Sequence, residues 1–221
     1  MFCRFSGCNL WSGRNADRAT ARCGLCDTDF MGTDGQSGGV YADAAALTVA
    51  ILAAFGEQQP EELFDDPMLN AMATAKAGLL WNGMGLVVAP YVPYVVFTGG
   101  EPALQLSHEL IQSLRSHRLE LAVETNGTLR LPDGLDWVTV SPKAGTELAV
   151  RTGQELKLLW PQQGIDPADY VTLPFEHFVL QPVDTGDPNR NTANGRQVLD
   201  YCLAHPKWRF GAQVHKFFGF M

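Results

Sequence analysis

Positive charge is scarce in this chain. Its 221 residues contain 16 Lys and Arg against 24 Asp and Glu, which leaves a formal net charge of -8 at pH 7. Proteins that bind nucleic acid neutralise phosphates with clustered Lys and Arg. The composition therefore excludes nucleic acid as a partner, and it favours a small-molecule substrate.

Cysteine is too sparse and too unevenly placed for a disulfide framework. Five cysteines is an odd number, and four of them lie within the first 26 residues. Secreted disulfide-rich domains carry paired cysteines, and the N-terminus also lacks the apolar core of an export signal. A chain of this length can bury a core without cross-links. We expect one domain over residues 1–221, located in the cytoplasm.

Charge is absent altogether from residues 77–100. That length would suffice for a membrane-spanning helix, but two glycines and two prolines interrupt the run. Residues 94–97 instead have the character of a buried strand that ends at a Thr-Gly-Gly turn. We therefore predict no membrane span.

Short apolar runs rich in β-branched or aromatic residues recur along the chain, and a polar or glycine-containing turn follows each of them. They predict strands at residues 2–5, 94–97, 119–123, 137–140, 155–159, 177–180 and 208–214. Segments with helical periodicity lie between several of them, at residues 43–55, 104–117 and 192–205. This alternation predicts an α/β fold with a mostly parallel sheet.

Residues 57–90 are predicted to be an insertion in this pattern. They form a long connection with a weak helical pattern at residues 67–78, and long connections of this kind are often functional. The segment is predicted to be either a lid or an extra helix.

Residues with side chains that can bind ligands or take part in catalysis follow several of the predicted strands. They lie at residues 98–102, 124–127, 141–143, 181–184 and 215–216. Ligands of barrels and open α/β sheets bind at the carboxyl ends of the strands. We expect the binding site at that edge.

Three cysteines suggest a metal centre close to the N-terminus. Cys8 is separated from Cys23 by an extended loop, residues 9–22, and Cys26 follows after two more residues. Zinc in structural sites takes four protein ligands, whereas an iron-sulfur cluster held by three thiolates keeps one iron open. Cys3 could complete a zinc site, but it shares a strand face with Phe5 that we predict to be buried.

These cysteines, joined to Thr98-Gly-Gly-Glu-Pro, resemble the radical S-adenosylmethionine (SAM) superfamily. The wide gap before Cys23 is unusual in that superfamily. Further blocks resemble one branch of it, the 7-carboxy-7-deazaguanine synthases. These blocks are Cys3-Arg-Phe-Ser-Gly-Cys-Asn-Leu-Trp-Ser-Gly, Cys26-Asp-Thr-Asp-Phe, Glu124-Thr-Asn-Gly-Thr, Ser141-Pro-Lys, Glu155-Leu-Lys, Gln181-Pro-Val-Asp and Val214-His-Lys.

The resemblance implies a modified, partly open (β/α) barrel that belongs to a lyase of queuosine precursor biosynthesis. This enzyme would convert 6-carboxy-5,6,7,8-tetrahydropterin into 7-carboxy-7-deazaguanine with loss of ammonia. Its cofactors would be a 4Fe-4S cluster, SAM and Mg²⁺. It would act as a homodimer and take electrons from an external donor such as a flavodoxin.

The resemblance also assigns a role to individual residues. Cys8, Cys23 and Cys26 would hold the cluster, and Thr28 would bind Mg²⁺. SAM would be bound by Gly100, Glu101, Ser141, Pro142, Lys143, Gln181, Pro182, Val183 and Asp184. The substrate would meet Arg4, Thr98, His215 and Met221, and Arg4 suits its carboxylate because a guanidinium is permanently charged.

Members of the family carry one more strand and a Leu-Gln-Gly-Glu-Gly stretch before the cysteines, so this chain is expected to lack the first strand of the barrel. We expect a protein extended upstream to be the active form. Equal turnover by both forms would contradict this expectation. Two other functions are open at this point: a radical SAM enzyme that activates a glycyl-radical protein, and a zinc-binding module without catalysis.

Overall fold

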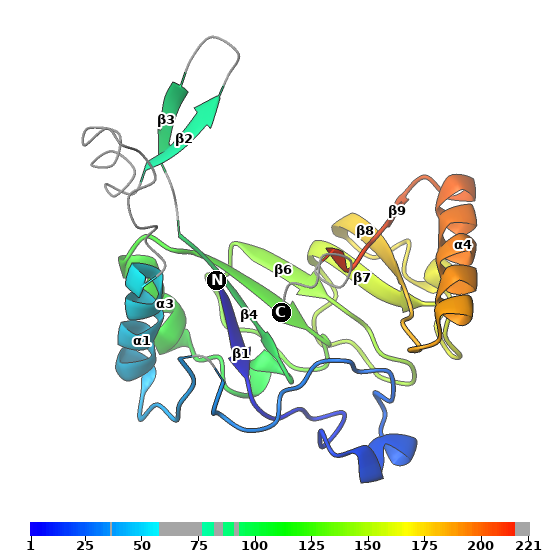
Figure 1. Ribbon diagram of the computed structural model, residues 1–221, viewed down its shortest axis with the longest axis horizontal. Helices are drawn as coiled ribbons and strands as arrows, with labels where there is room; N and C mark the ends of the chain where they lie inside the picture. Colours follow the sequence, from blue (N-terminus) through cyan, green and yellow to red (C-terminus); the bar gives the residue numbers. More distant parts are fainter. Residues whose placement is uncertain (36, 58–76, 82–85, 91–92, 215–221) are drawn as a thin grey trace.

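The computed structural model describes residues 1–35, 37–57, 77–81, 86–90 and 93–214, and its largest element is a seven-stranded sheet. The strands are β1 (Phe2–Phe5), β4 (Tyr94–Gly99), β5 (Glu120–Thr125), β6 (Trp137–Val140), β7 (Gly153–Trp160), β8 (Phe175–Pro182) and β9 (Trp208–Phe210). They follow one another in this order across the sheet, and every neighbouring pair is parallel. Among the described strands β1 and β9 are the edges, so the sheet is open (Figure 1).

All seven predicted strands of the α/β fold are confirmed, although some of their ends differ. The largest difference is at β9, which ends at Phe210 and not at residue 214. Its pairing with β8 stops at Leu180 and Phe210. Gly211 follows directly, and a side chain there would meet Val179 Cγ1 at 2.6 Å.

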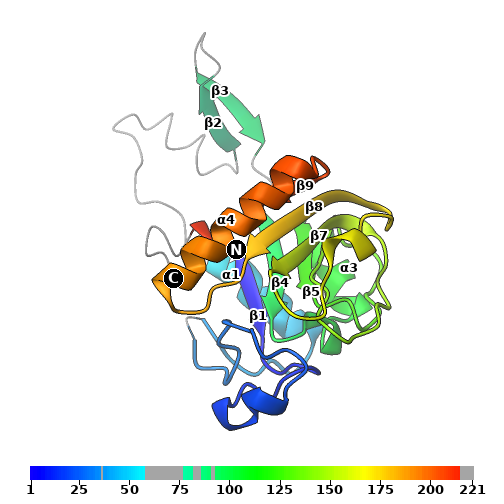
Figure 2. The ribbon, with the colours of Figure 1, turned by 90° about the vertical axis from the view of Figure 1, so that its right-hand side faces the viewer.

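Three helices cover one face of the sheet. They are α1 (Ala44–Glu57), α3 (His108–Ser116) and α4 (Pro188–Ala204). Figure 1 shows α1 and α3 side by side near β1 and β4, and Figure 2 shows α4 along β8 and β9. The predicted helices are present, but two predicted start points are wrong.

Helix caps explain both errors. Residues Pro102–Leu104 form a separate 3-10 turn, and α3 begins only after Ser107, whose hydroxyl accepts a hydrogen bond from Leu110 N. In α4 the start lies earlier than predicted, because Asp187 accepts hydrogen bonds from the N–H groups of Asn189 and Arg190. Pro188 then occupies the first turn, where a missing N–H costs nothing.

The core lies between the helices and the sheet, in two clusters of buried side chains. The first is made by β1, β4, β5, α1 and α3, and it contains Phe97, Leu114 and Leu121. The second is made by β6 to β9 and α4, and it contains Leu156 and Phe178. Because alternate residues of a strand point to opposite faces, each of these strands contributes every second residue to the core.

The strand residues that alternate with the core positions point to the opposite face of the sheet. Some of them form one row of polar side chains across that face. In this row Arg4 is paired with Thr98, Glu124 with Thr139, and Glu155 with both Thr139 and His177. None of these six side chains belongs to either apolar cluster. The sheet therefore presents a line of ionisable and hydroxyl groups on the face that the helices leave uncovered.

The predicted insertion, 57–90, includes a two-stranded antiparallel hairpin outside the main sheet. It consists of β2 (Ala77–Trp81) and β3 (Leu86–Pro90), with Ala77 opposite Pro90 (Figure 1). Most of the predicted helical pattern at residues 67–78 lies outside the described residues, but its last two residues belong to β2. In the described part of the chain no helix has the length and apolar character needed to cross a membrane.

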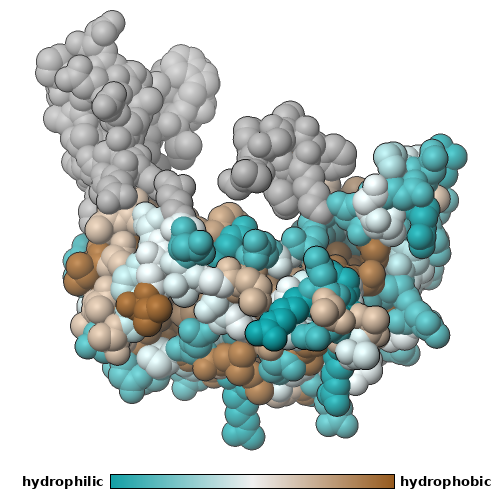
Figure 3. Space-filling view, turned by 60° about the horizontal axis from the view of Figure 1, so that its bottom comes forward, coloured by the Kyte–Doolittle hydropathy of each residue, from teal (hydrophilic) through white to brown (hydrophobic). Residues whose placement is uncertain are grey.

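Several exposed apolar side chains come from separate segments of the chain, whereas Leu199 and Leu203 lie one turn apart in α4. Leu25, Met31, Val40 and Leu104 are all exposed, and in the view of Figure 3 hydrophobic areas alternate with hydrophilic ones. This face presents no single continuous apolar surface.

Candidate active site at the carboxyl edge of the sheet

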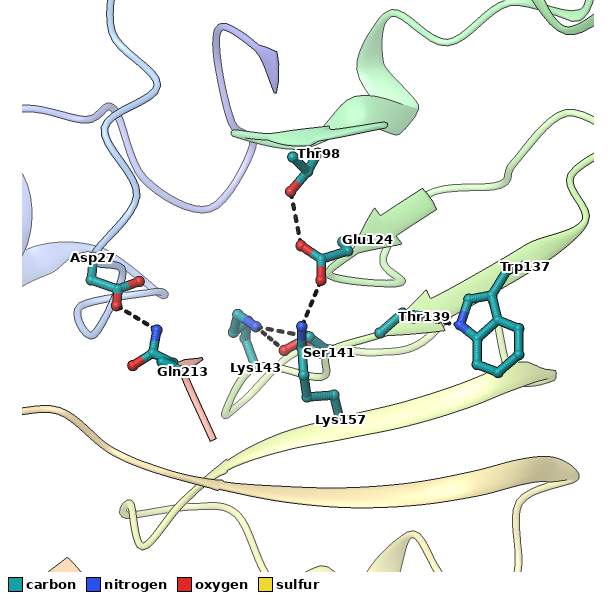
Figure 4. A network of polar contacts seen from close by, with 9 residues as sticks. All are labelled: Asp27, Thr98, Glu124, Trp137, Thr139, Ser141, Lys143, Lys157 and Gln213. Atoms are coloured by element: carbon teal, nitrogen blue, oxygen red, sulfur yellow. Dashed lines mark hydrogen bonds and ion pairs between the residues drawn. The ribbon is translucent and has the colours of Figure 1, made fainter. Parts of the chain in front are cut away.

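The loops that carry the predicted site residues converge at one edge of the sheet. Because the strands are parallel and stand in the order given above, the segments after β1, β4, β5, β6 and β8 leave the sheet on the same side. A hydrogen bond between Gln213 Nε2 and Asp27 Oδ2, 3.0 Å long, joins the cysteine segment to the residues after β9 (Figure 4). The sequence prediction of a site at this edge agrees with the arrangement of the strands.

The cysteine segment folds back on itself near Leu10. The carbonyl of Leu10 accepts hydrogen bonds from the backbone N–H groups of Arg22 and Cys23, at 3.1 and 3.4 Å. The N–H of Leu10 is 3.4 Å from Cys8 Sγ. Through Leu10, the long loop 9–22 brings Cys8 close to Cys23 even though they are far apart in sequence.

Two of the three thiols are in direct contact. A hydrogen bond from Cys23 lowers the pKa of Cys26 to about 6, and the same contact together with burial raises the pKa of Cys23. Cys8 is near enough to act electrostatically on Cys23. Lys143 is near enough to act on both Cys23 and Cys26, and its own pKa is lowered by burial. Cysteine binds metals as the thiolate, so thiols beside a lysine suit a group held by thiolates.

Cys3 does not take part in this cluster of thiols. Its side chain packs against the core cluster of β1, β4 and the helices, and burial raises its pKa to about 11. Over the described ranges no three His, Cys, Asp or Glu side chains group closely enough to enclose one metal ion. The cysteines of a cubane cluster bind different irons, so they need not surround a single point. The donor set therefore fits a cluster with three thiolates better than a four-cysteine zinc site.

The turn after β4 packs directly on the turn after β1. Gly100 N donates to Phe5 O and Glu101 N donates to Gly7 O, both at 2.9 Å. A Cβ on Gly100 would lie 1.9 Å from Gly7 O, and one on Gly99 would lie 2.3 Å from Phe5 O. Two glycines are needed here because backbone occupies the space of both side chains.

Glu101 is fully buried in this turn, and protein donors occupy both of its carboxylate oxygens. Oε1 accepts from Ala103 N at 3.0 Å and from Thr125 Oγ1 at 2.7 Å, and Oε2 accepts from Asn126 N at 2.8 Å. Asn126 Nδ2 in turn donates to Asn9 Oδ1 at 3.0 Å. Glu101 thus joins the loops after β4 and β5 to the residue that follows Cys8. A contact between this carboxylate and the amino group of SAM stays a prediction.

Arg4 and Thr98, the predicted substrate contacts, lie beside a carboxylate, Glu124, to which the sequence analysis gave no individual role. Thr98 Oγ1 donates to Glu124 Oε2 at 3.0 Å, and Lys157 Nζ lies 2.7 Å from Glu124 Oε1 (Figure 4). Burial acts to raise the pKa of Glu124, but Lys157, Thr98 and Arg4 outweigh it and the pKa is lowered. The alternation of strand residues was the available signal, because it places Glu124 and Lys157 on the same face as Thr98.

The remaining predicted residues lie on the same edge or outside the described residues. Lys143 Nζ donates to the carbonyl and the hydroxyl of Ser141, at 2.7 and 2.6 Å, and Pro142 between them is buried. The carbonyl of Thr28 is 3.9 Å from Cys26 Sγ. His215 and Met221 lie outside the described residues.

The predicted SAM segment at the end of β8 is tied to α4. The carbonyl of Val183 accepts from Asn194 Nδ2 at 2.8 Å, and Asp184 Oδ1 accepts from Asn191 Nδ2 at 2.7 Å. Gln181 and Pro182 are the last residues of β8. Binding of SAM by this segment stays a prediction.

Comparison with known proteins gives the family. No family model matches the chain. The chain is 53% identical to the 7-carboxy-7-deazaguanine synthase of Nitratidesulfovibrio vulgaris over 220 residues, which are 99% of this chain and 88% of that protein. It is 46% identical to the 7-carboxy-7-deazaguanine synthase of Bordetella pertussis over 219 residues, again 99% of this chain and 88% of that protein.

A solved structure shares the fold. The crystal structure of QueE from Escherichia coli superposes with a TM-score of 0.55, covering 95% of this chain and 82% of that one at 20% identity. The sequence relationships extend over nearly the whole chain, and the strands bring the matching blocks together at one edge. The chain belongs to the 7-carboxy-7-deazaguanine synthase family.

Proposed function

We propose that the protein is a radical SAM lyase that converts 6-carboxy-5,6,7,8-tetrahydropterin into 7-carboxy-7-deazaguanine and ammonia. The observation that carries the proposal is the identity of 53% to a 7-carboxy-7-deazaguanine synthase over 99% of the chain. The product and ammonia together contain all the atoms of the substrate, so the conversion is redox-neutral overall. When bound, the 4Fe-4S cluster and SAM would supply the radical chemistry that such a rearrangement needs.

The chain's own residues would bind and orient the two small molecules. Cys8, Cys23 and Cys26 would hold the cluster, and the partly buried ammonium of Lys143 nearby would offset its negative charge. SAM would meet the backbone of the glycine turn, where Gly100 packs directly on Gly7. SAM would also meet the loops at 141–143 and 181–184.

The substrate would lie over the polar row of the sheet. The guanidinium of Arg4 would bind its carboxylate, since the fork of donors matches two carboxylate oxygens. Glu124 would accept hydrogen bonds from the N–H groups of the pterin, and Thr98 would add a hydroxyl. Lys157 would keep Glu124 ionised and in position through their 2.7 Å contact.

Four further parts complete the proposal: a magnesium ligand, an electron donor, an assembly state and a location. Thr28 follows Cys26 closely and would supply an oxygen ligand to Mg²⁺, which keeps few protein ligands. An external one-electron donor such as a flavodoxin and assembly into a homodimer follow from the family resemblance. All five cysteines are free, which suits the reducing cytoplasm.

The test of the proposed function is anaerobic turnover. Reconstituted protein is incubated with SAM, Mg²⁺, reductant and carboxytetrahydropterin, and the mixture is searched for 7-carboxy-7-deazaguanine. We expect a brown protein that contains iron and sulfide and forms this product. A protein that carries a full cluster and cleaves SAM but forms no carboxydeazaguanine would refute the substrate assignment.

Replacement of Glu124 by Gln is expected to weaken binding of the pterin by about tenfold to a hundredfold, because it removes a charge-assisted acceptor. The measurement is calorimetric titration of anaerobic protein with the substrate. Glu120→Gln makes the same change at the exposed first residue of the same strand, β5, and serves as the matched control, with affinity expected within about threefold. Equal affinity of the Glu124 variant and the unaltered protein would remove Glu124 from the substrate site.

Replacement of Lys157 by Met is expected to shift the pH dependence of substrate binding. The folded pKa of Glu124 is lowered, so its ionised form persists below the usual range and is lost only as the pH falls through that lowered value. Without Lys157, the strongest influence that lowers the pKa of Glu124 is lost, so the pKa rises. Affinity measured as a function of pH should therefore start to fall at a higher pH in the Lys157 variant. An unchanged profile would contradict the role given to this ion pair.

A further inference from the structure

Arg18 lies in the long loop between Cys8 and Cys23 and is hydrogen-bonded to the turn that contains Cys23 and Cys26. The loop carries a 3-10 helix, Asn15–Thr20. From this helix Arg18 Nη1 donates to two carbonyls, Gly24 O at 3.0 Å and Cys26 O at 2.9 Å. Both hydrogens of this nitrogen are thus directed at the cysteine turn.

The guanidinium of Arg18 also stacks on an aromatic ring, that of Trp11. Its central carbon lies 4.0 Å from the centroid of the Trp11 ring, a cation–π geometry. Trp11 is only 7% exposed, and its ring packs edge-on against Phe30 at 5.5 Å. Its Nε1 donates to Arg14 O at 3.1 Å. Arg18 is therefore held between a fixed aromatic ring and the backbone of the turn.

This geometry restricts the shape of the turn. The two carbonyls belong to residues on either side of Leu25, so a single nitrogen that binds both sets the path of the chain from Cys23 to Cys26. In that path the thiols of Cys23 and Cys26 are in contact. A lysine could not hold the same arrangement, because its ammonium lacks the planar fork that stacks on an aromatic ring while donating from the edge.

We propose that Arg18 is a positioning residue that prearranges the thiols of Cys23 and Cys26 for metal binding. The part of this inference that concerns the cluster rests on the proposed function. The part that concerns the shape of the turn applies to the protein without metal as well. The extended loop then has a structural role, because it supplies Arg18, Trp11 and the 3-10 helix that together hold the turn in its shape.

Three variants test this role in the metal-free protein. Arg18→Gln removes the fork, Arg18→Lys keeps the charge, and Arg14→Gln removes an exposed arginine of the same loop as the matched control. Thiol alkylation followed by mass spectrometry reads the rate at each cysteine separately. We expect Cys23, which is buried, to react about tenfold faster in Arg18→Gln, about threefold faster in Arg18→Lys and within about twofold of the unaltered rate in Arg14→Gln.

Cys3 reports whether the whole protein has loosened, because it packs against the core of β1 and the helices. Its rate should stay unchanged in all three variants. An equal acceleration at Cys3 would overturn the inference, since Arg18 would then support the fold in general. An unchanged rate at Cys23 in Arg18→Gln would overturn it as well.

A second measurement connects the turn with the cluster. After anaerobic reconstitution, transfer of iron to a chelator should be about tenfold faster from Arg18→Gln than from the unaltered protein, in step with the thiol rates. An unaltered protein that takes up no iron and sulfide would count against the proposed function, while the alkylation rates would still decide the role of Arg18. Faster alkylation with an unchanged rate of iron loss would overturn the link to the cluster.

Discussion

Replacing Gly100 by alanine is expected to cost at least about 3 kcal/mol of folding stability, at the upper end of the range for overpacking. The added Cβ would lie 1.9 Å from Gly7 O and 2.5 Å from Gly7 C. Neither side can yield easily, because Gly100 N and Glu101 N are hydrogen-bonded to Phe5 O and Gly7 O. The clash would push the turn before Cys8 away from β4, so iron loading should fall together with stability.

Urea unfolding and iron analysis after anaerobic reconstitution measure both effects. Gly195→Ala is the matched control: Gly195 lies in α4 with nothing within 4 Å of a built Cβ, so its alanine variant should gain about 0.5–1 kcal/mol. A Gly100→Ala protein with unaltered stability and a full complement of iron would show that the two turns can separate without consequence.

Replacing Glu101 by alanine is expected to cost about 3–5 kcal/mol, because three donors lose their shared acceptor in a buried place. These donors are Ala103 N, Thr125 Oγ1 and Asn126 N. Glu101→Gln keeps the shape but puts an NH₂ group against one of the donors, so we expect a smaller loss of about 2 kcal/mol. The measurement is again the free energy of unfolding, on metal-free protein without SAM.

The same variants separate two roles of Glu101. If the carboxylate served mainly to bind the amino group of SAM, Glu101→Gln would weaken SAM binding and leave the stability of the metal-free protein unchanged. If it serves mainly to join the loops, stability falls in the absence of SAM. Thr125→Val removes one of the three donors and also the acceptor of Gly127 N, so it should cost about 2 kcal/mol.

The strands were predictable from the sequence because each one has a distinct local pattern. Residues 121–123 of β5, for example, are apolar and fully or almost fully buried, and runs of this kind are typical of a parallel sheet covered by helices. Helix starts were less predictable. For α4 the signal was present as Asp187 followed by Pro188, and the prediction placed too much weight on the apolar periodicity further along.

The composition of the site was predictable only in part. The cysteines and the Gly-Gly-Glu turn carry recognisable spacing, and the structure places them together. Glu124 and Lys157 lie 33 residues apart in the sequence, and nothing local connects them. Their contact depends on the register of β5, β6 and β7, which only the assembled sheet fixes. The hydrogen bonds that neighbouring backbone groups donate to Glu101 likewise cannot be predicted from a sequence motif.

The pairing of β1 with β4 has a consequence for the order of events during synthesis. Phe2 pairs with Val96 and Phe5 with Gly99, so the first strand has no partner in this sheet until about a hundred residues have left the ribosome. At about 5–20 residues per second, the cysteines that follow β1 therefore spend several seconds in an unfinished chain. Closing so long a loop is entropically costly. Insertion of iron and sulfide before that moment would meet cysteines whose segment does not yet pack on the glycine turn after β4, so the complete site forms only after β4 has paired with β1.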